Sequence, residues 1–105
     1  MKAWEILKKF GRCVDHSAED RFGNPVLVSS PEAAKFCVYG ATAKAYPDGD
    51  EYSRKITALK YHLAITLYGA ESWEAKNLAL GVAVTEWNRR KTDQQVIDTL
   101  KTVGI

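Results

Sequence analysis

A chain of 105 residues, with 46% hydrophobic and 27% charged residues, has the size and composition of one globular domain spanning residues 1–105. Its 15 Lys and Arg residues stand against 13 Asp and Glu residues, so the net charge of +2 lacks the basic excess typical of nucleic-acid-binding domains. Two cysteines, no leader-like N-terminus and no apolar run of ~20 residues predict a cytoplasmic protein with reduced thiols.

The N-terminal segment 2–14 has the periodicity of an amphipathic helix. Its apolar residues recur at spacings of three and four, and they are Ala3, Ile6, Leu7, Phe10 and Val14. Gly11 weakens this helix near its end. Segment 15–29 breaks the pattern and contains Gly23, Asn24 and Pro25 in succession, a strong turn signal. An irregular, ordered loop is therefore expected here, with residues 26–28 extended for a short distance.

Segment 30–46 predicts a central helix around which the others pack. Ser30 suits its N-cap and Pro31 its first turn. One ridge of this helix would consist of small side chains spaced by four, with Gly40 beside it: Ala33, Cys37, Ala41 and Ala45. Such a ridge lets a neighbouring backbone approach closely, which favours a packing role for Cys37 over a chemical one. The turn residues 47–50 are expected to end the helix.

Three further helices are expected in the second half of the chain. The first spans 52–68 and ends at Gly69; the second begins after Ser72 and continues to residue 88. Thr92 and Gln95 have the spacing of a capping box, which predicts a last helix from 92 to Gly104. The acidic residues 48, 50 and 51 are too few for a calcium loop and are interpreted as a helix start. The expected fold is an all-α, compact bundle of about five helices with an irregular loop between the first two.

The chemistry-bearing residues form no recognisable catalytic or metal-binding set. Cys13 and His16 are close in sequence, and Cys37 and His62 would complete four zinc ligands, but structural zinc sites bring ligands in two tight pairs. A cysteine nucleophile paired with a histidine requires a proximity that sequence spacing does not indicate here. No catalytic residue, metal or cofactor is assigned, and the chain is expected not to be an enzyme.

Arg89, Arg90 and Lys91 form the main basic cluster of the sequence. Together with Lys8, Lys9 and Arg12 they could contact phosphates, which makes nucleic-acid binding the alternative function. Two asparagines on the preceding helix are interpreted as structural. Asn77 is expected to bridge helices, and Asn88 to cap a helix end.

The chain also resembles a family of small uncharacterised proteins of bacteria and phages over about residues 23–100. The segments that carry the resemblance are Cys37–Ala41 preceded by Pro31–Ala33, the Trp87-Asn88 pair, and Thr92 with Val96 beyond it. Arg89 departs from the aspartate that the family often has. The resemblance implies a phage- or prophage-type accessory protein that binds a host or phage protein, and it implies no activity. A ligand-binding role would instead require a pocket beside Cys37 or His62.

Overall fold

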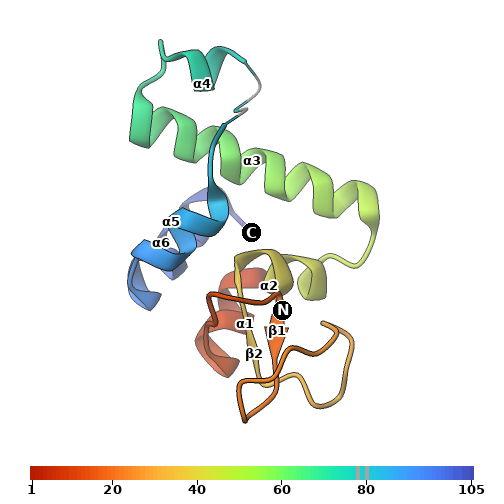
Figure 1. Cartoon of the computed structure of the whole chain (residues 1–105). Coiled ribbons are helices and arrows are strands. Elements are labelled where there is room, and N and C mark those ends of the chain that lie inside the picture. The colour runs from red at the N-terminus through yellow and green to blue at the C-terminus, as the bar shows by residue number, and fades with distance from the viewer. Residues whose placement is uncertain (78, 80) are drawn as a thin grey trace.

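The structure is a computed structural model that describes residues 1–77, 79 and 81–105. Its described part forms six helices and one small sheet (Figure 1). The helices are α1 (Ala3–Phe10), α2 (Val38–Ala45), α3 (Gly49–Tyr68), α4 (Trp73–Lys76), α5 (Val84–Arg90) and α6 (Asp93–Val103), and the strands are β1 (Ala18–Glu19) and β2 (Lys35–Phe36). The mostly helical fold is confirmed, whereas the strictly all-α bundle of five helices is wrong. Within the described ranges, no helix has both the length and the apolar character needed to cross a membrane.

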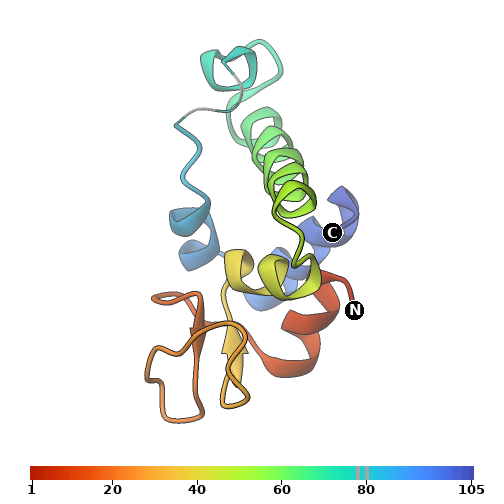
Figure 2. The ribbon, with the colours of Figure 1, turned by 90° about the vertical axis from the view of Figure 1, so that its right-hand side faces the viewer.

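The molecule is elongated, with extents of 43 × 27 × 20 Å. Helix α2 contacts both α1 and α3, and α6 contacts the same two helices. Figures 1 and 2 show the antiparallel β1–β2 sheet at one end of the molecule and α4 at the other. The largest fully buried side chains of the core between them include Phe36, Val38, Leu59, Leu63, Val84, Val96, Leu100 and Ile105.

Helix α1 ends four residues earlier than the periodicity predicted. Gly11 has a φ of 104°, a conformation that ends the helix and that glycine adopts without strain. Segment 11–13 then runs extended beside β2, where Phe36 donates to the Gly11 carbonyl and accepts from the Cys13 amide, each at 3.1 Å. The backbone of these residues is thus satisfied by pairing across the chain rather than within a helix.

The predicted central helix 30–46 begins only at Val38, so its N-terminal half is wrong. Ser30 does accept a hydrogen bond from a nearby amide, that of Glu32, but this closes a local turn. Residues 35–36 pair with β1 in an antiparallel register. Cys37 is the N-cap, since its sulfur accepts from the Gly40 amide at 3.4 Å. The small-residue ridge is consequently reduced to Ala41 and Ala45.

Gly40 allows a close approach, as the sequence suggested, but to a loop rather than to a helix. A Cβ built on Gly40 would lie 1.8 Å from the Ser17 carbonyl oxygen. The same carbonyl accepts a hydrogen bond from the Cys37 amide at 3.1 Å. The loop before β1 is therefore held directly against the first turn of α2.

Helix α3 confirms the prediction for 52–68 and begins three residues earlier. Asp48 caps it by accepting from the Glu51 amide at 3.0 Å, so residues of the predicted turn belong to the helix start. Asp50 and Glu51 lie in the first turn, where negative charge is favourable. Gly69 ends the helix with a φ of 97°.

The predicted helix from Ser72 to residue 88 is interrupted and forms α4 and α5 instead. Ser72 caps α4 as expected. Ala79 and Gly81 both have positive φ angles, of 57° and 82°, which are incompatible with a continuous right-handed helix. The expected apolar positions Leu78 and Leu80 lie outside the described residues.

Helix α6 agrees with its prediction at both ends. The Thr92 hydroxyl accepts from the Gln95 amide at 3.1 Å, and the Gln95 side chain accepts from the Thr92 amide at 3.0 Å. Gly104 closes the helix in the left-handed conformation that glycine favours. The capping box is confirmed.

Candidate functional site

Two adjoining hollows lie where the C-terminal half of α3 faces α5 and α6, and we call them together the α3–α5 groove. Their volumes are about 360 and 320 Å³, and Leu67, Trp87 and Lys91 line both. The other lining residues are His62, Leu63, Thr66, Tyr68, Ala83, Glu86, Arg90, Gln95, Asp98 and Thr99. On each helix, the lining includes residues spaced by four, which lie on the same face. Each wall of the groove is therefore one face of a helix.

Large apolar side chains are exposed around the end of α3. Ile65 and Leu67 are each 48% exposed, Tyr68 is 51% exposed and Trp73 at the start of α4 is 60% exposed. Half of the exposed large hydrophobic residues in the described part of the chain thus fall within nine consecutive positions. Leu67 and Tyr68 belong to the groove itself. Exposed apolar surface gathered beside a groove is typical of an interaction site.

The predicted basic cluster lies at the edge of this groove, but it is partly neutralised. Arg89 forms ion pairs with Asp15 at 3.3 Å and Glu86 at 3.9 Å, and Arg90 pairs with Glu86 at 3.5 Å. Lys91 forms no ion pair with any residue that the structure describes. Arg90 and Lys91 line the groove, whereas Arg89 does not.

Arg12, which the sequence suggested as a further phosphate contact, is used inside the fold. Its guanidinium donates to the backbone carbonyl of Asn88, to that of Lys91 at 2.7 Å, and to the Asp93 carboxylate at 2.7 Å. Only 10% of its side chain is exposed. The basic patch is therefore smaller than expected, because Arg12 satisfies the carbonyls at the end of α5.

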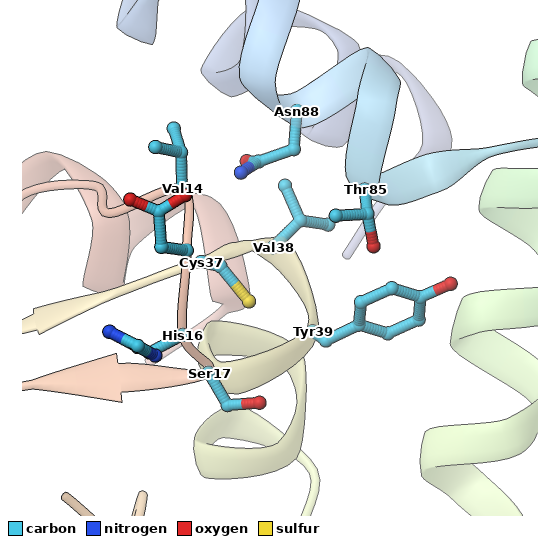
Figure 3. A pocket seen from close by; sticks show the side chains of 9 residues that line it. Val14, His16, Ser17, Cys37, Val38, Tyr39, Thr85 and Asn88 are labelled. Carbon is cyan, nitrogen blue, oxygen red and sulfur yellow. The ribbon is translucent and has the colours of Figure 1, made fainter. Parts of the chain in front are cut away.

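A second, smaller pocket lies beside Cys37 (Figure 3). Its volume is about 140 Å³, and its lining comes from loop 14–17, the start of α2, and Thr85 and Asn88 of α5. His16 belongs to this lining, but Figure 3 shows its ring and the Cys37 sulfur pointing in different directions. The arrangement shows no cysteine–histidine pair for nucleophilic catalysis.

The four candidate zinc ligands do not gather at one place. His62 lies in the α3–α5 groove, whereas His16 and Cys37 line the other pocket. No cluster of three or more metal-ligating side chains occurs among residues 1–77, 79 and 81–105. Both thiols are free. Burial raises the pKa of the Cys13 thiol to about 11, and the charges of Glu19 and Cys37 add to this effect.

The roles predicted for the two asparagines are exchanged. Asn77 donates from its side chain to the Trp73 carbonyl at 2.7 Å and closes the end of α4. Asn88 is buried, and its side-chain amide donates to the Cys13 carbonyl at 3.2 Å, so it joins α5 to the N-terminal segment. Position along the sequence indicated a structural role for each, but only the tertiary contacts show which segment each one reaches.

Comparisons with protein-family models, with curated proteins and with solved structures found no match to this chain. The site is therefore defined by its own geometry. Of the residues considered in the sequence, Cys37 lines the small pocket, His62 lines the α3–α5 groove, and the basic cluster lies at the edge of that groove. Sequence reasoning missed the groove formed by Leu67 and Trp87, whose only sequence signal was the continued apolar character of the α3 stripe through its last turn.

Proposed function

We propose that the chain is a non-enzymatic protein-binding domain and that the α3–α5 groove receives a helical segment of its partner. The main support for this proposal is the exposed apolar surface at the end of α3, which continues into a groove with Trp87 in its lining. Helix-in-groove recognition uses this combination, in which apolar anchors of an amphipathic helix enter a groove between helices. Aromatic residues at the centre of such a groove commonly contribute much of the binding energy.

The charges at the groove favour a partner helix that carries acidic side chains beside its apolar stripe. Lys91 is without an ion-pair partner among the described residues, and it lines both hollows. The Arg90–Glu86 pair is exposed, so exchanging it for a pair with the partner would cost little. Asp98 lies in the hollow lined by α6, so the acidic side chains of the partner are expected toward α5.

The direct test compares two Leu→Glu variants in affinity capture from host lysate followed by quantitative mass spectrometry. Leu67→Glu should abolish recovery of a stoichiometric partner, because it places a carboxylate in the apolar groove. Leu27→Glu is the matched control, since Leu27 is 77% exposed in the loop before β2 and is not part of this lining. A partner retained equally by both variants, or recovered by neither variant nor the wild type, argues against the proposal.

The chemistry of the partner is tested separately with two designed helical peptides. Both carry the same leucine stripe, but one has Glu and the other Lys at its flanking positions. The Glu peptide should shift the amide resonances of Leu67, Trp87 and Lys91 in a salt-sensitive manner, and Lys91→Glu should weaken this binding. Equal binding of both peptides would exclude the charge complementarity.

Nucleic-acid binding through Arg89, Arg90 and Lys91 is the alternative, and it has weaker support. Ion pairs with Asp15 and Glu86 reduce the charge that Arg89 and Arg90 can offer to phosphates. If it holds, gel shifts at low salt should show retardation that is lost in the triple Ala variant of these residues. No retardation at low salt would eliminate this alternative.

The biological setting is a further part of the proposal. The resemblance to small bacterial and phage proteins supports a phage- or prophage-type accessory role in the host cytoplasm, with a host or phage protein as the partner. An accessory protein of this kind can modulate a host system by occupying one surface of a host component, without chemistry of its own. The identity of the protein captured by the groove would decide between a host and a phage partner.

A further inference from the structure

The two cysteines, which are 24 positions apart in sequence, are brought to equivalent positions of two paired segments. Arg12 and Phe36 form a parallel β-bridge, and Cys13 and Cys37 are the residues that follow them. The Cys13 amide donates to the Phe36 carbonyl at 3.1 Å, which holds the two segments together at this point. Neighbouring strands lie about 4.8 Å apart. A disulfide requires Cα atoms about 4.4–6.8 Å apart, so this pairing is within its range.

The pairing is fixed by contacts on both sides of the two cysteines. The Cys13 thiol donates to the His16 carbonyl at 3.1 Å, and the Cys37 amide donates to the Ser17 carbonyl at the same distance. The Ser17 carbonyl also occupies the position that a side chain at Gly40 would take. Segment 13–17 therefore packs against the start of α2, where Cys37 lies.

The two thiols differ in access and in chemical surroundings. Both cysteines are buried, but Cys37 lines the pocket of about 140 Å³, whereas Cys13 is not part of that lining. The Gly40 amide also places a hydrogen-bond donor against the Cys37 sulfur. Burial raises the pKa of Cys13, which keeps that thiol protonated at neutral pH. Cys37 is thus the sulfur that meets an oxidant first.

We propose that Cys13 and Cys37 form a dithiol site that a small hydroperoxide, entering through the pocket, converts to an intramolecular disulfide. The Cys37 thiolate attacks the peroxide oxygen, the O–O bond breaks, and the departing hydroxide takes a proton to become water, which leaves a sulfenic acid. The Cys13 sulfur then loses its proton and attacks the Cys37 sulfur, and the hydroxyl group leaves as a second water. Two thiols and one hydrogen peroxide give one disulfide and two waters.

The first experiment treats the reduced, folded chain with stoichiometric hydrogen peroxide and maps the products by mass spectrometry. The expected product is a monomer lighter by two hydrogen atoms, with peptides containing Cys13 and Cys37 linked. Bridges between molecules only, or a Cys37 sulfinic acid beside a free Cys13 thiol, would overturn the proposal.

Single variants test which sulfur reacts first. In Cys13→Ser, dimedone should trap a sulfenic acid on Cys37, because no second thiol can displace it. In Cys37→Ser, Cys13 should remain unlabelled at the same peroxide concentration, since it is not part of the pocket lining. Labelling of Cys13 in that variant, with the fold intact by circular dichroism, would overturn the order of the two steps.

Equilibration of the wild-type chain with glutathione and glutathione disulfide measures how strongly the fold favours the bond between Cys13 and Cys37. The effective concentration of one thiol toward the other should be at least ~10-fold higher in the folded chain than in the same chain in urea, because folding holds the two segments together. An equal or lower value in the folded chain would show that the native structure does not favour the disulfide.

Discussion

Gly40 shows how a single missing Cβ decides the geometry around α2. The carbonyl of Ser17 occupies the position that a side chain at residue 40 would need, and it also accepts the hydrogen bond of the Cys37 amide. The loop before β1, the cap of α2 and the Cys37 pocket therefore depend on the same contact. Helical spacing in the sequence indicated that a close approach would occur at Gly40, but not that a loop would make it.

Gly40→Ala should strongly destabilise the protein, because its Cβ would lie 1.8 Å from a backbone oxygen. The free energy of unfolding measured by urea denaturation should fall by about 3 kcal/mol or more, since backbone must move to relieve the overlap. Gly49→Ala is the matched control. It lies in the first turn of α3 with nothing within 4 Å, and it should be neutral or stabilising. A similar effect of both substitutions would contradict the steric explanation.

Cys13 should make the stability of the protein depend on alkaline pH. The thiol loses its proton near pH 9 in the unfolded chain and near pH 11 in the folded protein. Between these values the folded state binds more protons, so the free energy of unfolding should fall as the pH rises from 9 to 11. Tyr39, Tyr46 and Tyr52 also have raised pKa values, and they act in the same direction above pH 10.

Comparison with the Cys13→Ala variant separates the contribution of the Cys13 thiol to this loss of stability from that of the tyrosines. Urea denaturation at pH 8, 9, 10 and 11 should show a shallower loss of stability in the variant than in the reduced wild-type protein. Identical slopes would show that the Cys13 thiol ionises equally in both states.

At the scale of the elements, the helices that agree best with prediction are those whose ends are encoded locally. Helix α6 has its capping box and its terminal glycine within its own sequence, and α3 has Asp48 and Gly69. Helix α2 is the opposite case, because its N-cap is a cysteine and the residues before it pair with β1. Capping signals can be recognised in the sequence because they involve neighbouring residues. The pairing of a segment with a strand far away in the chain cannot be recognised in this way.

Thr92→Ala should destabilise the protein by about 1 kcal/mol, because it leaves the Gln95 amide without its side-chain acceptor. Thermal or urea denaturation measures this loss. Thr102→Ala on the same helix is the control, since its exposed hydroxyl only bonds back to the Asp98 carbonyl and alanine favours helix. An equal loss in the two variants would mean that the cap contributes nothing specific.

At the scale of the whole molecule, one arginine with a mostly buried side chain joins the N-terminal and C-terminal parts of the chain. Arg12 follows α1, and its three acceptors belong to residues 88, 91 and 93 at the junction of α5 and α6. Asn88 makes a second link by donating to Cys13, and the Ile105 carbonyl accepts from the Trp4 amide at 3.3 Å. These polar links fix how the C-terminal helices meet the N-terminal segment, and with it the position of α5 in the groove.

Arg12→Ala should therefore cost about 3 kcal/mol of unfolding free energy, since carbonyls at the end of α5 lose a charged donor in a mostly buried place. Arg89→Ala is the matched control. Its ion pairs are half exposed, and it should cost less than about 1 kcal/mol. Arg12→Lys should not restore stability, because an ammonium group lacks the planar fork that meets several acceptors. Urea denaturation of the three variants measures these losses. Wild-type stability in Arg12→Lys would show that the charge alone matters.

The sequence alone determined the helical character of the chain, the extent of α3 and α6 to within a few residues, and the irregular loop before α2. Periodicity, caps and glycine stops carry this information because they act between residues at most four positions apart. They also indicated that Cys37 and Gly40 lie at a packed position.

Only the tertiary structure decided where α2 begins, why residues 73–88 form two helices, and which residues face the groove. Pairing of β2 with β1 removes residues 35–36 from the predicted helix, and the positive φ angle of Ala79 has no signal in its residue type. The groove depends on how α3 faces α5 and α6, and the pairing of the segments that carry Cys13 and Cys37 depends on a parallel bridge between Arg12 and Phe36. Contacts of this kind join residues far apart in the chain, so no local pattern records them.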